Sequence, residues 1–294
     1  MPFRSMLFVP GNNAKMVEKA VKLEADAIIL DLEDAVPIHE KENARLIVQD
    51  SIRRFGSSNQ LHLFIRINSI SSELYREDID KAVQKNVEGL MIPKSETVDD
   101  VKTIETLLRE REKELGLEQG GITFIPLIET AKGVLHAYEL ASASRRIVAL
   151  GFGSVDFTAD IGAKPLGDGL EINYPRAYIS VAAHAARVQA IDTPWVNITD
   201  LEGLIKDCKI ARQLGFTGKM AIHPSQLNIV NRMFSPTDEE ITYAKKVVEA
   251  FEKALEAGLG ATSLEGKMID RASYRQAMNI LQFSKLIEKG KQAL

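Results

Sequence analysis

Cysteine is nearly absent from this sequence, since Cys208 is the one thiol among 294 residues. A single cysteine excludes an internal disulfide, and its position in a stretch of helical spacing predicts a buried, unreactive side chain. Long hydrophobic runs are absent too, because runs such as residues 27–30 fall far short of the roughly 20 residues that a membrane helix needs. The N-terminal residues show no signal-peptide pattern. We therefore expect a cytoplasmic protein.

An excess of positive charge is also missing. The chain has 37 Lys and Arg against 41 Asp and Glu, which gives a net charge of −4. No global positive field draws it to nucleic acid or to an anionic membrane. The composition is typical of a globular protein, with 45% hydrophobic and 27% charged residues, 19 Gly and 10 Pro. It excludes a disordered chain and a collagen. The length fits two domains, or one barrel with an extension.

Short apolar runs alternate with longer stretches of helical spacing along most of the chain. Strands bounded by turns and apolar throughout suit a parallel sheet that is covered on both faces, and their spacing favours a closed (β/α)8 TIM barrel. The alternative is an open doubly wound sheet, but residues 10–13 lack the glycine-rich phosphate loop expected there. The predicted strands are residues 6–10, 27–33, 61–68, 89–94, 122–129, 147–153, 190–194 and 218–224.

The chain after the eighth predicted strand is longer than one closing helix requires. We expect a barrel over residues 1–234 and a C-terminal helix-loop-helix extension over residues 235–294, packed on a neighbouring subunit. Thr237 and Glu240 form a capping-box pattern that begins the first helix of this extension. The glycine-rich residues 258–266 predict a loop before the last helix.

In a parallel barrel the reactive groups collect at the carboxyl ends of the strands, so position along each strand selects candidate residues. Charged groups there are costly to bury unless they are paired, and their convergence therefore indicates a site. The residues selected in this way are Asp31, Glu33, Asp34, Arg66, Asn68, Lys94, Glu129, Gly153, Ser154, Asp156 and His223.

Carboxylates that face one barrel mouth repel each other unless a cation joins them. An all-oxygen set without clustered His or Cys suits Mg²⁺, and Glu129 and Asp156 close two adjacent predicted strands. The alternative is that either acid pairs with Arg66 or Lys94. The planar fork of Arg66 matches a substrate carboxylate, but an internal salt bridge to an acid of the second strand would use the same fork.

Two further strand-end residues have alternative roles. Lys94 could form a Schiff base if burial lowered its pKa, but an ion pair with the nearby acids is the favoured interpretation. His223 either begins a helix or contacts a ligand.

Seven short segments together resemble the citrate lyase β-subunit family, which sits within the HpcH/HpaI aldolases and has malyl-CoA and citramalyl-CoA lyases among its relatives. The match runs from residue 4 to about residue 277 in the same order and with similar spacing. The segments are RSMLFVPG at 4–11, LDLEDAV at 30–36, RIN at 66–68, IPK at 92–94, IET at 128–130, GFGSVDF at 151–157 and GKMID at 266–270.

The resemblance implies a barrel that assembles as trimers or hexamers and uses Mg²⁺. It implies that Asp270 is the catalytic acid/base and reaches into the mouth of a neighbouring subunit. The resemblance and the strand-end positions together assign the other roles. Glu129 and Asp156 bind the metal, and Arg66 and Glu33 take part in catalysis. Arg66, Glu129, Gly153 and Ser154 bind the substrate, and Lys15 and Arg4 contact the phosphates of CoA or a carrier.

The activity implied is the reversible cleavage of a 3-hydroxy-acyl thioester into a 2-oxo acid and an acyl thioester. Residues 221–226, with His223-Pro224, depart from the wording of citrate lyase β subunits and favour malyl-CoA or citramalyl-CoA over a citryl thioester. A further departure is Arg271 directly after Asp270. Two alternatives stay open: a β subunit acting on citryl-acyl carrier protein beside an α subunit, and a malate synthase or thioesterase reaction at the same site.

Overall fold

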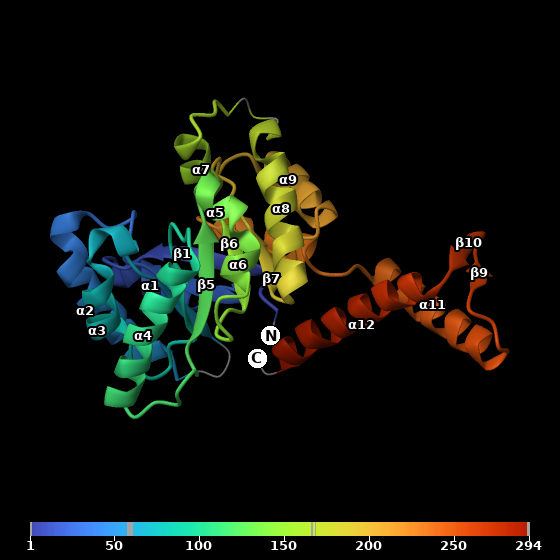
Figure 1. Ribbon diagram of the computed structural model, residues 1–294, viewed down its shortest axis with the longest axis horizontal. Coiled ribbons are helices and arrows are strands. Elements are labelled where there is room, and N and C mark those ends of the chain that lie inside the picture. Colours follow the sequence, from blue (N-terminus) through green and yellow to red (C-terminus); the bar gives the residue numbers. More distant parts are fainter. Residues whose placement is uncertain (1, 58–60, 166, 168, 293–294) are drawn as a thin grey trace. The chain divides into compact units, whose positions relative to one another are not determined.

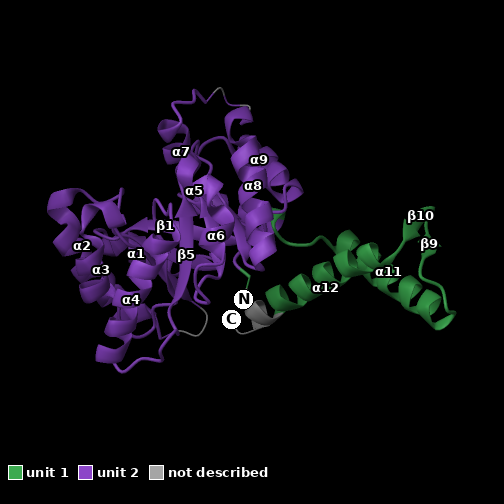
Figure 2. Ribbon diagram, viewed as in Figure 1, with its two compact units in different colours: residues 1–2, 233–294 green, residues 3–232 purple. Residues whose placement is uncertain are grey.

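The computed structural model describes residues 2–57, 61–165, 167 and 169–292. The chain forms two compact units, Phe3–Arg232 and Met233–Leu294 together with the first two residues (Figure 2). In the described part of the chain no helix is long and apolar enough to cross a membrane.

Residues Phe3–Arg232 form a closed barrel of eight parallel strands in chain order (Figure 1). The barrel closes because Met6 of the first strand lies in register with Ala27 of the second and with Met220 of the eighth. The predicted TIM barrel is thereby confirmed. The strands are β1 (Ser5–Pro10), β2 (Ala27–Asp31), β3 (His62–Arg66), β4 (Gly89–Ile92), β5 (Thr123–Ile128), β6 (Ala149–Phe152), β7 (Gln189–Asp192) and β8 (Gly218–Ala221).

Apolar side chains from the strands fill the barrel interior, which is a packed core and no pore. Met6, Phe64, Ile125, Ile191 and Met220 belong to this buried cluster. Alternate strand residues point outward and are buried under the surrounding helices, which explains strands that are apolar on both faces.

Helices lie between the strands of the barrel unit. Residues 131–141 form two short helices and not one, because His136 leaves helical geometry with φ −102° and ψ 14°. Pro175 lies inside a helix that begins at Leu170. Cys208 is buried, as predicted, and burial raises the pKa of its thiol to about 12. The helices are α1 (Ala14–Ala20), α2 (Lys41–Phe55), α3 (Tyr75–Ala82), α4 (Val98–Glu114), α5 (Ala131–Leu135), α6 (Ala137–Ala141), α7 (Ser154–Asp160), α8 (Leu170–Ala186), α9 (Leu201–Gln213) and α10 (Leu227–Met233).

A buried carboxylate anchors the end of α4. Glu112 is fully buried, and Arg146 donates to both of its oxygens, each at 2.6 Å. The backbone amides of Gly120 and Ile122 donate to the same carboxylate at 3.0 and 3.2 Å. Burial alone would raise the pKa of Glu112, but these hydrogen bonds outweigh it and hold the pKa below its usual value.

We expect Glu112→Gln to lower the free energy of unfolding by about 3 kcal/mol, because the buried Arg146 guanidinium loses its main counter-charge and keeps only Glu105, whose Oε1 lies 3.7 Å from Nε. Since the folded pKa of Glu112 is depressed, the contribution of this carboxylate is present above its ordinary pKa of 4.5 and is lost as the pH falls below that. Denaturant titrations of the variant and the wild type should therefore differ at pH 7 and converge in acid.

Glu114→Gln is the matched control on the same helix, because the Glu114 side chain is 64% exposed and its ion pair with Arg111 lies in solvent. It should change stability by less than about 0.5 kcal/mol. A Glu112 variant as stable as this control at pH 7 would contradict the prediction.

The second unit consists of two helices and a hairpin. Helix α11 (Asp238–Glu256) begins with the expected capping box of Thr237 and Glu240, and α12 (Arg271–Gln292) packs against it. The prediction of a loop over 258–266 is wrong for its last part. Strand β9 (Thr262–Leu264) pairs antiparallel with β10 (Lys267–Ile269). Glu265 and Gly266, with φ of 50° and 78°, form the two-residue turn between them, a conformation that glycine permits.

Candidate active site

An arginine–aspartate pair closes two neighbouring strands at the carboxyl end of the barrel. Asp31 and Arg66 are the last residues of β2 and β3 and lie in register. Arg66 donates through Nε to Asp31 Oδ1 at 2.7 Å and through Nη2 to Asp31 Oδ2 at 2.6 Å. Its guanidinium also lies over the Phe8 ring, 4.8 Å from the centroid. Asp31 therefore fixes the plane of Arg66 and leaves Nη1 as the nitrogen that faces the mouth acids.

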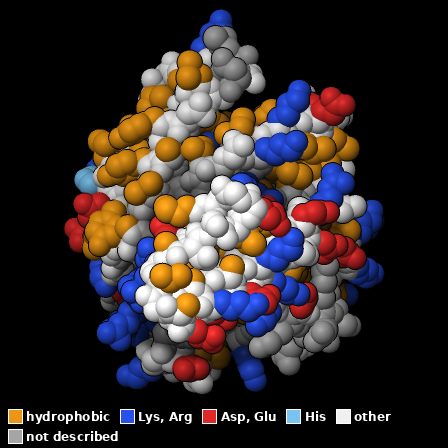
Figure 3. Space-filling model, turned by 90° about the vertical axis from the view of Figure 1, so that its right-hand side faces the viewer, with side chains coloured by type: hydrophobic (Ala, Val, Ile, Leu, Met, Phe, Trp, Pro, Cys, Tyr) orange, Lys and Arg blue, Asp and Glu red, His pale blue; other side chains and the backbone are white. Residues whose placement is uncertain are grey.

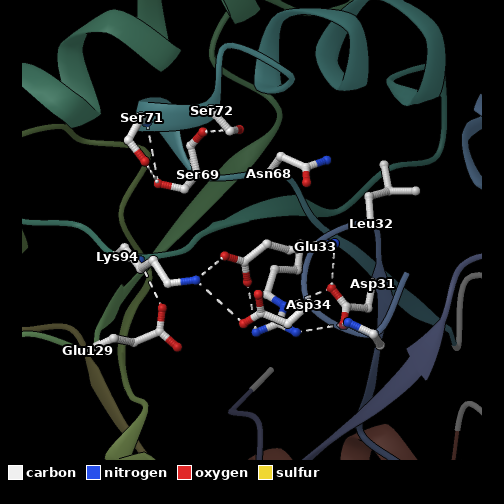
Figure 4. Close-up of polar contacts among 12 residues, drawn as sticks. Asp31, Leu32, Glu33, Asp34, Asn68, Ser69, Ser71, Ser72, Lys94 and Glu129 are labelled. Carbon is white, nitrogen blue, oxygen red and sulfur yellow. Dashed lines mark hydrogen bonds and ion pairs between the residues drawn. The ribbon is translucent and has the colours of Figure 1, made fainter. Parts of the chain in front are cut away.

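A lysine links three acids of the mouth (Figure 4). Lys94 Nζ lies 2.5 Å from Glu33 Oε1 and 3.4 Å from Asp34 Oδ2, while the Lys94 backbone N donates to Glu129 Oε2 at 2.8 Å. Lys94 has φ of 49°, a left-handed conformation that is uncommon for a lysine. Burial alone would lower the pKa of Lys94, but the neighbouring carboxylates outweigh it and raise the pKa well above its usual value. Lys94 therefore forms ion pairs with the neighbouring acids, the interpretation that the sequence favoured over a Schiff base.

We expect treatment with sodium borohydride in the presence of a 2-oxo acid to leave the mass of the intact protein unchanged. A Schiff base requires an unprotonated amine, and the carboxylates around Lys94 keep its ammonium form. A mass increase that Lys94→Met removes would show that the lysine reacts, whereas an increase kept by Lys94→Met would report labelling of another amine.

Glu33 lies between the two cations of the mouth. Its Oε2 is 3.1 Å from Arg66 Nη1, but the contact lacks hydrogen-bond geometry, and this buried oxygen accepts no hydrogen bond. Burial raises the pKa of Glu33 above its usual value, although Arg66 and Lys94 act in the opposite direction. The internal salt bridge considered for Arg66 therefore exists, with Asp31 as its main partner and Glu33 as its second.

A buried glutamate packs against a glycine on the next strand. Glu129 follows β5 directly and is 2% exposed, and Gly153 follows β6. A Cβ on Gly153 would lie 2.6 Å from both Cγ and Oε1 of Glu129, so only glycine leaves room for this carboxylate. Burial and the charge of Glu33 raise the pKa of Glu129 to about 8, with a smaller contribution from Asp156, while Arg66 and the Lys94 amide act against them. Among the described residues none donates to Glu129 Oε1.

The turn after β6 carries Asp156, the other predicted metal ligand. Gly153 N donates to Ile128 O at 2.9 Å, and Ser154 N donates to Thr193 Oγ1 at 3.1 Å. Protein acceptors therefore use both of these amides, and the contact of Gly153 and Ser154 with a substrate stays a prediction. Asp156 is half-buried in the first turn of α7, close enough for its charge to affect Glu129.

The donor set fits a hard divalent cation with open coordination positions. In the residues that the structure covers, no group of three or more His, Cys, Asp or Glu side chains is arranged to hold a metal. Glu129 and Asp156 alone supply two carboxylates, which is the number that Mg²⁺ commonly takes from protein while it keeps water and substrate oxygens. The unpartnered oxygen of Glu129, beside the space that a Gly153 side chain would fill, is the point where a cation would relieve the buried charge.

The remaining predicted residues lie elsewhere. Arg4 precedes β1 at the amino end of that strand and is buried against Asp26, with Nη2 to Oδ1 at 2.6 Å, and its phosphate contact stays a prediction. Lys15 is exposed in the first turn of α1, and its phosphate contact stays a prediction. His223 Nδ1 accepts from Ser225 N at 3.2 Å and caps a short 3-10 helix, in agreement with its structural interpretation.

Asp270 belongs to the second unit and lies directly after β10. Its Oδ1 accepts from the backbone N and the Oγ of Ser273, at 2.9 and 3.0 Å, and from Ala272 N at 3.0 Å. These contacts cap the start of α12. The Ser273 hydrogen bonds lower the pKa of Asp270, so the carboxylate form is favoured.

Sequence reasoning did not assign a role to several residues that shape the mouth. Lys41 Nζ donates to the backbone oxygens of Leu32 and Glu33, both at 2.7 Å, and so holds the loop that carries Glu33. Nothing in the sequence distinguishes Lys41 from a solvated helix lysine. Asp31 stood among the strand-end acids, and its place near the end of the predicted strand next to that of Arg66 was the signal that could have identified their pairing.

Comparisons with known proteins agree with this geometry. The model of the HpcH/HpaI aldolase/citrate lyase family matches residues 4–224, and that of the C-C bond lyases of the TIM-barrel fold matches residues 176–287. The chain is 38% identical to citrate lyase subunit beta of Leuconostoc mesenteroides subsp. cremoris, over 96% of this chain and 93% of that protein. It is 35% identical to mitochondrial citramalyl-CoA lyase of Rattus norvegicus, over 98% and 88% of the two chains.

One solved structure that resembles this chain contains bound ligands. It is CitE of Mycobacterium tuberculosis in complex with magnesium, acetoacetate and coenzyme A. It has a TM-score of 0.76 and 27% identity, covering 96% of this chain and 97% of the other. The family resemblance expected from the sequence motifs is confirmed.

Proposed function

This chain belongs to the HpcH/HpaI aldolase/citrate lyase family, and we propose that it is a Mg²⁺-dependent carbon–carbon lyase that cleaves a 3-hydroxy-acyl thioester into a 2-oxo acid and an acyl thioester. The observation that carries the proposal is the buried Glu129 carboxylate, which packs on Gly153, senses the charge of Asp156 and has one oxygen that accepts from none of the described residues. The magnesium and coenzyme A bound by the mycobacterial relative support it.

Glu129 and Asp156 would hold the cation, which when bound supplies Lewis-acid stabilisation of charge on the reacting oxygens. Arg66, held in plane by Asp31, would orient the carboxylate of the 2-oxo acid through its remaining nitrogen. Lys94 keeps Glu33 at the mouth, where its carboxylate would lie beside the substrate.

Asp270 would exchange a proton with the substrate hydroxyl or with the carbon next to the thioester, depending on the direction of the reaction. Its pKa lies below the ordinary 3.8, so Asp270 is a carboxylate at neutral pH and would accept the hydroxyl proton first. Removal of this proton starts the collapse to the 2-oxo acid and the thioester enolate.

We propose a CoA thioester, citramalyl-CoA or malyl-CoA, as the substrate, with Lys15 contacting a CoA phosphate. The similarity to a citramalyl-CoA lyase and the coenzyme A of the mycobacterial structure support this choice. The similarity to citrate lyase β subunits favours the second candidate, citryl-acyl carrier protein in a complex with an α subunit.

We propose that the chain acts in the cytoplasm as a trimer or hexamer in which the second unit packs on a neighbouring subunit and brings Asp270 to its mouth. Two exposed apolar regions support self-association: Leu170, Tyr174 and Val181 of α8 are 72%, 65% and 68% exposed, and Met268 beside Asp270 is 72% exposed. Figure 3 shows exposed hydrophobic side chains gathered in the upper part of the face that it presents.

The deciding experiment assays the purified protein alone against citramalyl-CoA, malyl-CoA and citryl-acyl carrier protein, with and without Mg²⁺. We expect cleavage of a CoA thioester that EDTA abolishes and added Mg²⁺ restores. Full activity in EDTA would contradict the proposed mechanism. Activity that appears only after addition of an α subunit and acyl carrier protein would support the second candidate, and release of free CoA from acetyl-CoA and glyoxylate would indicate a malate synthase reaction.

A further inference from the structure

Thr193 connects the end of β7 to the turn that carries Asp156. It follows β7 directly and is 3% exposed. Its Oγ1 accepts from Ser154 N at 3.1 Å and shares a second hydrogen bond of 2.7 Å with Ser154 Oγ. Ser154 is the first residue of α7, two positions before Asp156. One hydroxyl thus contacts the helix start that bears a proposed metal ligand.

The glycine at the start of α7 explains why a distant hydroxyl is needed there. Helix starts leave backbone amides without intrahelical acceptors, and the side chain of the N-cap residue usually accepts from one of them. The N-cap of α7 is Gly153, whose missing Cβ leaves the space that Glu129 occupies. Because Gly153 has no side chain to cap the helix, Thr193 provides an acceptor from the neighbouring strand.

The residue before Thr193 is held by buried ion pairs. Asp192 Oδ2 lies 2.5 Å from Lys219 Nζ and 2.9 Å from Arg176 Nη2. Both cations also contact Asp207, Lys219 at 2.5 Å and Arg176 at 2.9 Å. All of these side chains are buried. Two acids and two bases that share contacts away from water are stabilised only in a well-defined geometry, so the end of β7 is fixed in position.

We propose that Thr193 is a positioning residue for the cation site, where its hydroxyl fixes the first turn of α7 so that Asp156 lies beside Glu129. The proposal rests on the proposed function, because it requires that Glu129 and Asp156 bind Mg²⁺. Thr193 contacts neither the cation nor the substrate. Partners of this kind beyond the ligands commonly change metal affinity by about 10- to 100-fold when they are removed.

The test measures Mg²⁺ binding by isothermal titration calorimetry on the full chain. Thr193→Val removes the hydroxyl and keeps the volume, and we expect its dissociation constant for Mg²⁺ to rise at least about tenfold. Thr193→Ser keeps a hydroxyl at this position, and its dissociation constant for Mg²⁺ should stay within about twofold of the wild-type value. Thr217→Val is the matched control, because Thr217 Oγ1 accepts from Gln189 Nε2 at 3.0 Å at the opposite end of the barrel. It should also leave Mg²⁺ binding unchanged.

Wild type and Asp156→Asn separate this inference from the function on which it rests. If the wild type binds Mg²⁺, Asp156→Asn abolishes binding and Thr193→Val binds as tightly as the wild type, the inference alone is overturned. If the wild type does not bind Mg²⁺, or if Asp156→Asn binds Mg²⁺ as tightly as the wild type, the proposed function and the inference both fail.

Amide hydrogen exchange tests the same contact without any variant, should Thr193→Val fail to fold. We expect the Ser154 amide of the wild type to exchange at least about tenfold more slowly than the Val155 amide, since Thr193 accepts only from the former. Equal rates for the two amides would overturn the proposal.

Discussion

Glu129→Gln is expected to abolish Mg²⁺ binding and to lower kcat/KM by about 10³-fold or more, because Lewis-acid stabilisation of the reacting oxygens contributes several kcal/mol. Glutamine has nearly the shape of glutamate, and its side-chain carbonyl can still accept from Lys94 N, so the mouth keeps its structure. Only the charge that holds the cation is removed. Calorimetric titration with Mg²⁺ and initial rates on the accepted thioester measure the two effects.

Glu88→Gln makes the same chemical change at the other end of the barrel, where Glu88 precedes β4 and pairs with His62 at 3.2 Å. It should leave Mg²⁺ affinity and kcat/KM within about twofold of the wild type, as expected for a half-exposed ion pair. An unchanged Mg²⁺ affinity of Glu129→Gln would show that Glu129 is not a metal ligand.

The barrel could be predicted because its strands are buried on both faces. Such strands appear in the sequence as short runs that are apolar throughout, and each of the eight predicted runs overlaps one observed strand. The carboxyl ends of parallel strands then place Arg66, Lys94 and Glu129 at one mouth of the barrel, independently of the loop conformations. Position along the strand was therefore enough to bring these residues together.

The pairing of those residues could not be predicted from position alone. Asp31 occupies two nitrogens of Arg66, and Thr193 occupies the Ser154 amide, through contacts between residues 35 and 39 positions apart. Arg4 belongs to a matching motif but lies at the amino end of its strand, where the motif alone did not indicate its pairing with Asp26. The hairpin over 262–269 was missed because a glycine in a two-residue turn resembles a glycine in a loop.

Asp270→Asn is expected to lower kcat by about 10²- to 10⁴-fold, the usual effect of removing a general acid or base. Asparagine is as good an N-cap residue as aspartate, so its side-chain oxygen should keep the hydrogen bonds from Ser273 and Ala272 that start α12. Melting temperature and Mg²⁺ affinity should therefore match the wild type. Asp200→Asn is the matched control, because Asp200 caps α9 in the same way through Gly203 N at 2.8 Å, and it should keep full activity.

Mixing two inactive variants tests where Asp270 acts. If Asp270 serves a neighbouring subunit, an oligomer reassembled from Asp270→Asn and Glu129→Gln chains contains mouths in which an intact Glu129 meets an intact Asp270 from the other chain. We therefore expect activity to return on mixing, although each variant alone is inactive. If Asp270 acted within its own chain, every mouth in the mixture would lack one of the two carboxylates and no activity would return. An Asp270→Asn protein that turns over as fast as the wild type would exclude this aspartate as the acid/base in either arrangement.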